Sequence, residues 1–555
     1  MAINKLVIIG GVAGGASCAA RARRLSEDAE IVLFERGPYV SFANCGLPYY
    51  VGNVITDEDD LLVASPELFV DRFKIDVRIE SLVESIDRAG RQVMVRNLKT
   101  GERYRESYDA LVISPGSAPV RPNLPGIDLP GIFTLRTIPD TQRIVERVRG
   151  GGVRSAAVVG GGFIGLEMTE NLHRLGISVD LIEAQPHVMP ALDPEVASFI
   201  HTHLAEKGIR LRLRSAVSRF EAQDRGLSIH LDSGRTLGAD MVLLAVGVRP
   251  ESGLAVDAGL AVGETGGIVV NDRMQTSDPR IYAVGDAVET QDAVTSFPCL
   301  IPLAGPANRQ GRIAADALFG EHFEHRFRGV QGTAVVGVMG LTVASTGLSE
   351  KALKQRQTNI AFDKIYVHPE SHAGYYPDAK TITLKVIFDK ADGRVLGAQA
   401  VGEKGVEKRI DVIATAIQFS GTVFDLEEAE LCYAPQYGSA KDPVNMAGMV
   451  AANALRGLSP TAQWENLKEG EDFVLDVREP EEYEQGRVDG AVHIPLHELR
   501  SRIGELPKER AIHVHCHVGQ RSHIAARILR QNGFDAFNLT GGYRLYEAWE
   551  RLRRG

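Results

Sequence analysis

The chain is long, acidic and ordinary in composition. Its 555 residues contain 62 Lys and Arg against 72 Asp and Glu, for a formal net charge of −10, and 44% are hydrophobic. This length predicts three or four domains at roughly one per 150 residues. The acidic balance argues against a large basic surface for nucleic acid. No run reaches the roughly 20 apolar residues that span a bilayer, and the first residues are typical of a strand, not a signal peptide.

The cysteines indicate a reducing compartment. The chain has five, an odd number, with no spacing typical of a disulfide framework or a zinc site: Cys18, Cys45, Cys299, Cys432 and Cys516. Free thiols suit the cytoplasm. We therefore expect a cytoplasmic protein without a resident metal.

The first residues predict a nucleotide-binding βαβ unit. A strand at residues 5–9 is followed by G-G-V-A-G-G at 10–15, a helix over 14–25 and a strand at 30–34. Glycines here let the backbone approach a pyrophosphate, and the acid after the second strand accepts ribose hydroxyls. The candidate cofactor residues are Gly10, Gly11, Gly15, Glu35 and Arg36. Val12 occupies the middle glycine position, which loosens the fingerprint.

Cys45 is the most informative residue. It lies in S-F-A-N-C-G-L-P-Y-Y at residues 41–50, shortly after the first glycine loop. Flavin disulfide reductases of the glutathione reductase type usually carry C-x-x-x-x-C at such a place, and this segment resembles theirs except that Tyr50 stands at the second position. A lone thiol must cycle through a mixed disulfide, a persulfide or a sulfenic acid.

A second βαβ unit begins near residue 155. A strand at 156–159 precedes G-G-G-F-I-G at 160–165, and a strand at 178–182 ends at Glu183. Gly160, Gly162 and Gly165 fit the dinucleotide pattern fully. Glu183 would repel a 2′-phosphate, which favours NADH over NADPH.

Residues 276–286, T-S-D-P-R-I-Y-A-V-G-D, resemble the second FAD signature of two-dinucleotide flavoproteins. The resemblance implies that Asp286 contacts the flavin side of FAD. FAD is then expected at the first glycine loop and NADH at the second.

The pattern of apolar and polar residues changes after about residue 327. Apolar and polar residues alternate at 333–343 and 381–388, which predicts an antiparallel sheet, and a helical pattern covers 406–419. A stretch of small residues at 451–460 is typical of a linker. The last residues form another α/β unit.

This last unit resembles a single rhodanese domain. The carrying motifs are V-L-D-V-R-E-P-E-E-Y from 474, G-A-V-H-I-P from 490, H-C-H-V-G-Q-R-S from 515 and T-G-G-Y from 540. Cys516 and Arg521 delimit a C-x-x-x-x-R loop whose N–H groups would surround the sulfur and lower the thiol pKa. The loop is one residue shorter than that of related phosphatases and suits sulfur transfer.

Residues 1–452 resemble coenzyme A disulfide reductases. The carrying motifs are both glycine loops, S-F-A-N-C-G and Y-A-P-Q-Y-G-S-A-K-D-P-V-N at 433–445. The resemblance implies a homodimer in which Tyr375 and Tyr433 from the partner assist at the sulfur, with the adjacent Tyr376 as the alternative to Tyr375. Candidate contacts to coenzyme A are Arg21, Arg24, Ser41 and Asn44.

We therefore predict an α/β, glutathione reductase-like two-dinucleotide flavoprotein with an α+β dimerisation domain and a C-terminal α/β rhodanese domain. The expected boundaries are 1–113 with 248–325 for FAD, 114–247 for NADH, 326–450 for dimerisation, 451–463 for a linker and 464–555 for rhodanese.

The expected function is NADH-dependent reduction of coenzyme A (CoA) persulfide at Cys45, with release of sulfide and with polysulfide and CoA disulfide as further candidate substrates. Cys516 would transfer sulfane sulfur from a donor. Two alternatives stay open: an NADH oxidase or peroxidase using a sulfenic acid, and a non-reductive sulfur carrier or redox sensor.

Overall fold

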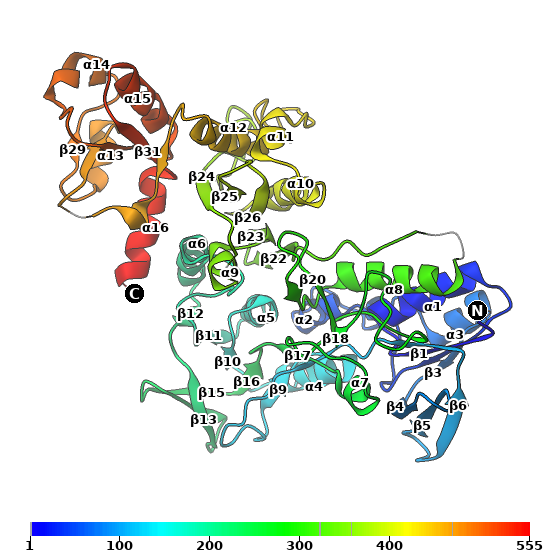
Figure 1. Cartoon of the computed structure of the whole chain (residues 1–555). Helices are drawn as coiled ribbons and strands as arrows, with labels where there is room; N and C mark the ends of the chain where they lie inside the picture. Colours follow the sequence, from blue (N-terminus) through cyan, green and yellow to red (C-terminus); the bar gives the residue numbers. More distant parts are fainter. Residues whose placement is uncertain (1–2, 321–323, 357, 469, 555) are drawn as a thin grey trace. The chain divides into compact units, whose positions relative to one another are not determined.

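The computed structural model describes residues 3–320, 324–356, 358–468 and 470–554. The chain forms two compact units (Figure 1). Unit 1 comprises Met1–Ala184 and Arg212–Val330, and unit 2 comprises Gln185–Leu211 and Gln331–Gly555. Within the described ranges, no helix is long and apolar enough to cross a membrane.

The first nucleotide-binding sheet of unit 1 is parallel, as its sequence predicts. Its strand order is β19-β7-β1-β2-β3, with β1 (Lys5–Ile9), β2 (Glu30–Phe34), β3 (Asp76–Arg78), β7 (Ala110–Ile113) and β19 (Ile281–Ala283). The central strands are almost continuous apolar runs because both faces of the sheet are buried: one packs against helical residues such as Ala19 and Ile313, and the other against strand residues such as Val83 and Val95. Helices α1 (Ala13–Leu25) and α8 (Ala304–Phe319) lie side by side (Figure 1). They approach so closely that a Cβ on Gly311 would lie 2.3 Å from the Gly14 carbonyl oxygen.

The second nucleotide-binding sheet repeats this pattern. Strand β10 (Ser155–Val159) pairs in parallel with β11 (Ser178–Ile182) and β16 (Met241–Leu244), and β16 pairs with β9 (Ile132–Thr134). Helix α5 (Phe163–Arg174) follows β10 directly. The expected strands at 156–159 and 178–182 are confirmed.

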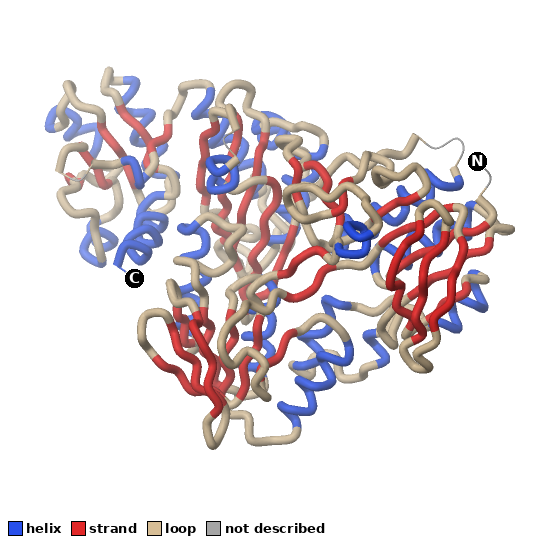
Figure 2. Tube along the Cα trace, turned by 60° about the horizontal axis from the view of Figure 1, so that its bottom comes forward, coloured by secondary structure: helices blue, strands red, loops and turns tan. Residues whose placement is uncertain are grey.

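Smaller elements complete unit 1 (strands red in Figure 2). Its remaining helices are η1 (Asn44–Gly46), α2 (Leu47–Val51), η2 (Asp59–Leu61), α3 (Pro66–Phe73), α4 (Ile138–Arg149) and α7 (Gly253–Asp257). Its remaining strands are β4 (Ser81–Asp87), β5 (Gln92–Asn97), β6 (Arg103–Ser107), β8 (Ser117–Pro119), β13 (Val217–Ala222), β14 (Leu227–Leu231), β15 (Thr236–Ala239), β17 (Val248–Pro250), β18 (Ile268–Val269), β20 (Val288–Gln291) and β21 (Pro298–Cys299), while β12 (Arg210–Arg212) lies at the boundary with unit 2.

Unit 2 contains the antiparallel sheet expected from the alternating segments. Its order is β22-β23-β26-β25-β24, with β22 (Ala334–Val338), β23 (Leu341–Gly347), β24 (Phe362–Val367), β25 (Ile382–Asp389) and β26 (Val395–Gly402). The run at 333–343 is therefore the start of a hairpin. The helices are α6 (Pro194–Glu206), α9 (Glu350–Gln355), α10 (Val406–Gln418), α11 (Val423–Glu428) and α12 (Pro443–Leu455).

The last part of unit 2 is a parallel sheet with flanking helices. Its order is β27-β31-β30-β28-β29, with β27 (Thr461–Ala462), β28 (Phe473–Asp476), β29 (Val492–His493), β30 (Ile512–His515) and β31 (Ala536–Leu539). The helices are η3 (Trp464–Asn466), α13 (Pro480–Gln485), α14 (Leu499–Arg502), η4 (Ile503–Glu505), α15 (Gln520–Gln531) and α16 (Gly542–Arg554).

The linker expected at 451–463 is wrong at both ends. Helix α12 continues to Leu455, because its Ala-rich sequence favours a helix, and β27 already pairs with β31. Within 451–463, only residues 456–460 and Gln463 lie outside a helix or strand. The two parts of unit 2 are also bonded directly: Lys364 of β24 pairs with Glu465 of η3. The segment is therefore a short connection, not a free tether.

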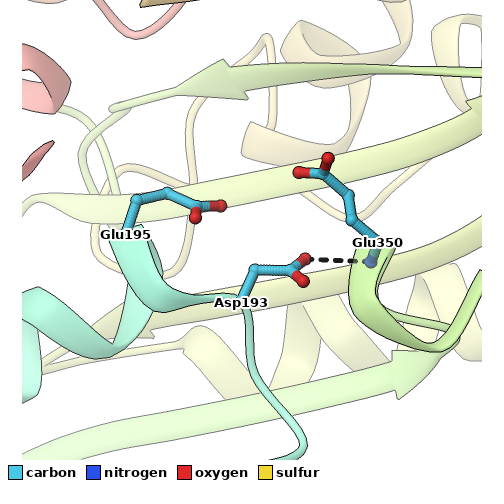
Figure 3. A group of neighbouring side chains, drawn as sticks. All are labelled: Asp193, Glu195 and Glu350. Atoms are coloured by element: carbon cyan, nitrogen blue, oxygen red, sulfur yellow. Dashed lines mark hydrogen bonds between the residues drawn. The ribbon is translucent and has the colours of Figure 1, made fainter. Parts of the chain in front are cut away.

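A buried ionic cluster joins several segments of unit 2. The carboxylates of Asp193, Glu195 and Glu350 come within 4.8 Å of one another (Figure 3). Lys385 of β25 is fully buried, and its Nζ lies 2.7, 2.6 and 2.5 Å from these three groups, respectively. The lysine ammonium therefore supplies the positive charge that such carboxylates require.

Candidate functional site

The first glycine loop joins β1 to α1 in a close turn. Gly10 has φ +94°, and a Cβ there would lie 2.0 Å from the Ser114 carbonyl oxygen. A Cβ on Gly15 would lie 1.9 Å from the Gly10 carbonyl oxygen. Glu35 is buried and accepts a 2.8 Å hydrogen bond from the Gly11 N–H. Loop, helix N-terminus and acid are thus held together, as a dinucleotide requires.

The second loop has the same construction and an open backbone at its centre. A Cβ on Gly165 would lie 1.9 Å from the carbonyl oxygen of Gly160, so only glycine fits there. A Cβ on Gly162 would meet nothing within 4 Å, which leaves this backbone accessible to a pyrophosphate. The buried Glu183 accepts a 2.7 Å hydrogen bond from the Gly161 N–H. These residues fit a dinucleotide.

The other two predicted cofactor residues have protein partners. Asp286 follows β19 and accepts a 3.2 Å hydrogen bond from the Ser117 hydroxyl, with the Arg136 guanidinium 3.7 Å away. Arg36 forms a two-pronged ion pair with Glu251, at 2.9 and 2.6 Å. Arg36 is therefore directed at a carboxylate of unit 1.

The Cys45 loop lies beside the first glycine loop. The Ser41 N–H donates to the Gly11 carbonyl oxygen over 2.8 Å, and Ser41 has φ +49°. Cys45 is in η1 and is exposed. Tyr50, which stands at the second cysteine position of the C-x-x-x-x-C pattern, is buried at 8% exposure. The Oδ1 of Asn44 is buried without a hydrogen-bond partner among the described residues, which suits a ligand donor.

Three charges act on the Cys45 thiol. Although the residue is exposed, partial burial of its sulfur raises the thiol pKa, the carboxylates of Glu167 and Asp286 raise it further, and the Arg136 guanidinium opposes them. The thiolate therefore needs additional positive charge or hydrogen-bond donors, which bound ligands can supply.

Glu167 is a site residue that the sequence reasoning missed. It lies on α5, and its Oε1 accepts a 3.3 Å hydrogen bond from the Tyr49 hydroxyl, four residues after Cys45. Burial raises the pKa of Glu167 to about 7, against the opposing bond from Tyr49. The available signal was its place in G-G-G-F-I-G-L-E, directly after the second loop. This carboxyl can hold or release a proton near Cys45 at neutral pH.

The residues predicted to contact coenzyme A differ in how accessible they are to a ligand. The Nε of Arg21 is 2.7 Å from Asp316 Oδ1 on α8, so this arginine is committed to an internal ion pair. Arg24, on the same helix, is exposed. Ser41 and Asn44 are in the Cys45 loop itself.

The two tyrosines expected from the partner subunit meet in unit 2. The hydroxyl oxygens of Tyr375 and Tyr433 are 2.7 Å apart, and the side chains are exposed. The Tyr433 hydroxyl raises the pKa of Tyr375 by sharing this hydrogen bond. Tyr376 instead packs edge-on against His372, with ring centroids 5.8 Å apart. The pairing favours Tyr375 over its neighbour as the functional tyrosine.

The C-terminal cysteine occupies a cradle between β30 and α15. The buried Cys516 Sγ accepts hydrogen bonds from the Gly519 N–H at 3.1 Å and the Ser522 hydroxyl at 3.4 Å. Arg521 donates two 2.6 Å bonds to Glu482 of α13, and this guanidinium holds the pKa of Glu482 at about 2. Arg521 is thus tied to a carboxylate that the sequence analysis did not single out.

The comparisons with known proteins agree with this architecture. The chain matches the family described as pyridine nucleotide-disulphide oxidoreductase over residues 4–311, the dimerisation domain of that family over 333–442 and the rhodanese-like domain over 459–549. The coenzyme A disulfide reductase of Staphylococcus epidermidis is 36% identical over 449 residues, which cover 81% of this chain and 100% of that protein.

Two solved structures extend over nearly the whole chain. Reduced Bacillus anthracis CoADR-RHD is 47% identical with a TM-score of 0.96, covering 99% of this chain and 98% of that one. An NAD-dependent persulfide reductase from A. fulgidus is 38% identical with a TM-score of 0.91, covering 98% and 100%. The chain therefore belongs to the flavin-dependent pyridine nucleotide-disulphide oxidoreductases, among relatives of the coenzyme A disulfide reductases, and carries a C-terminal rhodanese domain.

Proposed function

We propose that the chain is an NADH-dependent reductase of CoA persulfide that works as a homodimer, with polysulfide and CoA disulfide as further substrates. The observation that carries this proposal is the presence of two separately built thiols in one chain. Cys45 has Tyr50 at the second cysteine position, and Cys516 has an intact hydrogen-bonded cradle. A lone redox thiol suits a mixed disulfide, and a rhodanese thiol suits sulfane sulfur.

The two glycine loops support one assignment of the nucleotides. FAD would be held by the first loop with Glu35 and Asp286, and NADH by the second loop with Glu183. When bound, FAD would carry two electrons from NADH to the sulfur at Cys45. The Glu183 carboxylate disfavours a 2′-phosphate. Comparing kcat/KM for NADH and NADPH tests this assignment, and equal values would refute it.

At the first thiol, the Cys45 thiolate attacks the CoA-side sulfur of CoA-S-SH. A Cys45–S–S–CoA bond forms, the S–S bond of the persulfide breaks, and HS⁻ leaves. Two electrons and one proton then return the thiolate and CoA-SH. The Tyr375–Tyr433 pair, contributed by the partner subunit in this proposal, would donate a proton to the leaving thiolate; the hydrogen bond between the two hydroxyls supports a joint role.

At the second thiol, Cys516 takes the outer sulfur from a persulfide donor and releases the donor thiol. The Gly519 N–H and the Ser522 hydroxyl stabilise the resulting Cys516 persulfide anion. The CoA thiol then attacks that outer sulfur and passes its proton to it; the Cys516 S–S bond breaks, which regenerates the Cys516 thiolate and makes CoA-S-SH. The two sites then act in sequence on CoA, which receives sulfur at Cys516 and is reduced at Cys45.

The decisive experiment is anaerobic oxidation of NADH with CoA persulfide and CoA disulfide side by side, with sulfide recorded. Faster turnover on the persulfide with stoichiometric sulfide supports the proposal. Faster turnover on the disulfide without sulfide makes the chain a CoA redox enzyme. Rapid NADH consumption with oxygen or peroxide alone indicates the oxidase or peroxidase alternative.

Single serine variants separate the two thiols. Cys45→Ser should abolish NADH-linked reduction and leave sulfur transfer intact, whereas Cys516→Ser should abolish transfer and leave reduction of added CoA persulfide intact. Cys432→Ser, at another exposed cysteine, is the matched control. Loss of both activities in either single variant would refute separate roles.

A further inference from the structure

The turn after β31 supports the backbone of the Cys516 loop. It contains Gly541 and Gly542, with φ +73° and +57°. A Cβ on Gly542 would lie 2.6 Å from the Cys516 carbonyl oxygen, so the two segments are in direct contact. The Tyr543 N–H donates to that same oxygen over 2.7 Å, and the Arg544 N–H donates to the His517 carbonyl oxygen over 3.0 Å. Any shift of this turn therefore moves the nucleophile's own backbone.

The other side of this turn is held by the sheet of the dimerisation part. His368, directly after β24, is buried, and its Nε2 is 3.1 Å from the Gly541 carbonyl oxygen. Its Nδ1 is 3.0 Å from the Thr383 hydroxyl on β25. The Tyr366 N–H donates to the Thr540 hydroxyl oxygen over 2.8 Å. These contacts therefore join the dimerisation part of unit 2 to its rhodanese part.

The hydrogen-bond partners determine the state of this histidine. A carbonyl oxygen only accepts, so His368 Nε2 carries the proton and Nδ1 accepts from the Thr383 hydroxyl. Burial lowers the pKa of His368 to about 3, and the Arg544 guanidinium lowers it further. The ring is therefore neutral at neutral pH and is fixed in one tautomer and one orientation.

We propose that His368 is a positioning residue of the rhodanese site, holding the turn on which the Cys516 loop rests through its bond to Gly541. The inference rests on the proposed sulfur transfer by Cys516. It extends the site into the dimerisation part, some 150 positions earlier in the sequence. His368 touches neither the sulfur nor a substrate in this scheme, and its effect passes through backbone atoms.

The test uses the full-length chain and compares His368→Phe with His368→Gln. Phenylalanine removes the donor, while the glutamine amide can still donate to the Gly541 carbonyl oxygen. His368→Phe should lower kcat for sulfur transfer from a persulfide on the order of 10- to 100-fold, because small displacements of a reacting group are that costly. KM should change little, and His368→Gln should restore most of kcat.

A second readout separates positioning from a general loss of structure. The rate of Cys516 alkylation at neutral pH, resolved by peptide mass spectrometry, should be lower in His368→Phe than in the wild type and in His368→Gln, because a displaced loop no longer holds the sulfur against the Gly519 N–H, whereas unfolding would raise the rate. Thr383→Val, which removes the partner of Nδ1, should give a smaller shift in the same direction. NADH-linked reduction at Cys45 should be unchanged in all variants and reports that they fold.

Two outcomes refute the inference. One is an unchanged kcat and an unchanged rate of Cys516 alkylation in His368→Phe; the other is an equal loss of kcat in His368→Phe and His368→Gln. Absence of sulfur transfer in the wild type would refute the proposed function instead, and is seen before any variant is compared.

Discussion

Replacing the buried Lys385 with methionine should strongly destabilise unit 2. The Lys385 side chain is 0% exposed, and its ammonium contacts the carboxylates of Asp193, Glu195 and Glu350. Methionine fills much of the same volume but leaves three buried negative charges without their central cation. Breaking a buried ion pair from one side costs about 3–5 kcal/mol.

This loss of folding free energy corresponds to a large fall in the melting temperature of unit 2. At about 2–4 °C per kcal/mol for a unit of roughly this size, the transition of unit 2 should fall by about 6–20 °C. Differential scanning calorimetry of the full-length chain measures it. Lys390→Met is the matched control, because that side chain is 55% exposed and lies 3.8 Å from its partner Asp363. The control should change stability by less than about 0.5 kcal/mol.

The pH dependence gives a second check with a definite sign. Burial disfavours the charged form of Glu350, but Lys385 and Lys364 outweigh it and hold its pKa at about 2. A lowered carboxyl pKa contributes stability above the unfolded value of about 4.3, and this contribution is lost as the pH falls towards 2. Without Lys385 the pKa of Glu350 rises, so the stability gap between variant and wild type should narrow between pH 7 and 5. A loss below about 1 kcal/mol at pH 7, or a gap that stays constant, would refute the reasoning.

Three further predictions concern the reduction proposed at Cys45. Glu167→Gln removes a carboxylate that raises the thiol pKa, so the pKa of Cys45, read from its alkylation by iodoacetamide against pH, should fall; an unchanged value would contradict this. Tyr375→Phe and Tyr433→Phe should each slow CoA persulfide reduction on the order of 100-fold, with the double variant no slower than the slower single one, because the hydroxyls act as one pair; multiplied losses would indicate independent roles. Arg24→Ala should raise KM for CoA persulfide with kcat unchanged, while turnover of a small persulfide without phosphates stays constant; a fall in kcat alone would exclude a binding role.

Local patterns in the sequence predicted the parts of the fold in which a few consecutive residues decide the backbone. Both glycine loops are of this kind, since Gly15 and Gly165 are required by contacts with glycines only five positions earlier. The Cys516 loop is similar, because its sulfur is bonded to Gly519 and Ser522 within the same segment. The local pattern misled at Ala451–Leu455. Small residues there are compatible with a linker, but they also favour a helix, and they form the end of α12.

The sequence by itself thus determined the order of the nucleotide-binding, dimerisation and rhodanese parts, and it predicted Cys45 and Cys516 as the reactive cysteines. Only the tertiary structure showed Glu167 bonded to Tyr49, Tyr375 bonded to Tyr433, and His368 bonded to Gly541. These pairs are separated by 118, 58 and 173 positions, respectively. No local periodicity encodes such contacts, because they depend on how whole sheets and helices pack, and packing is decided by burial summed over many residues.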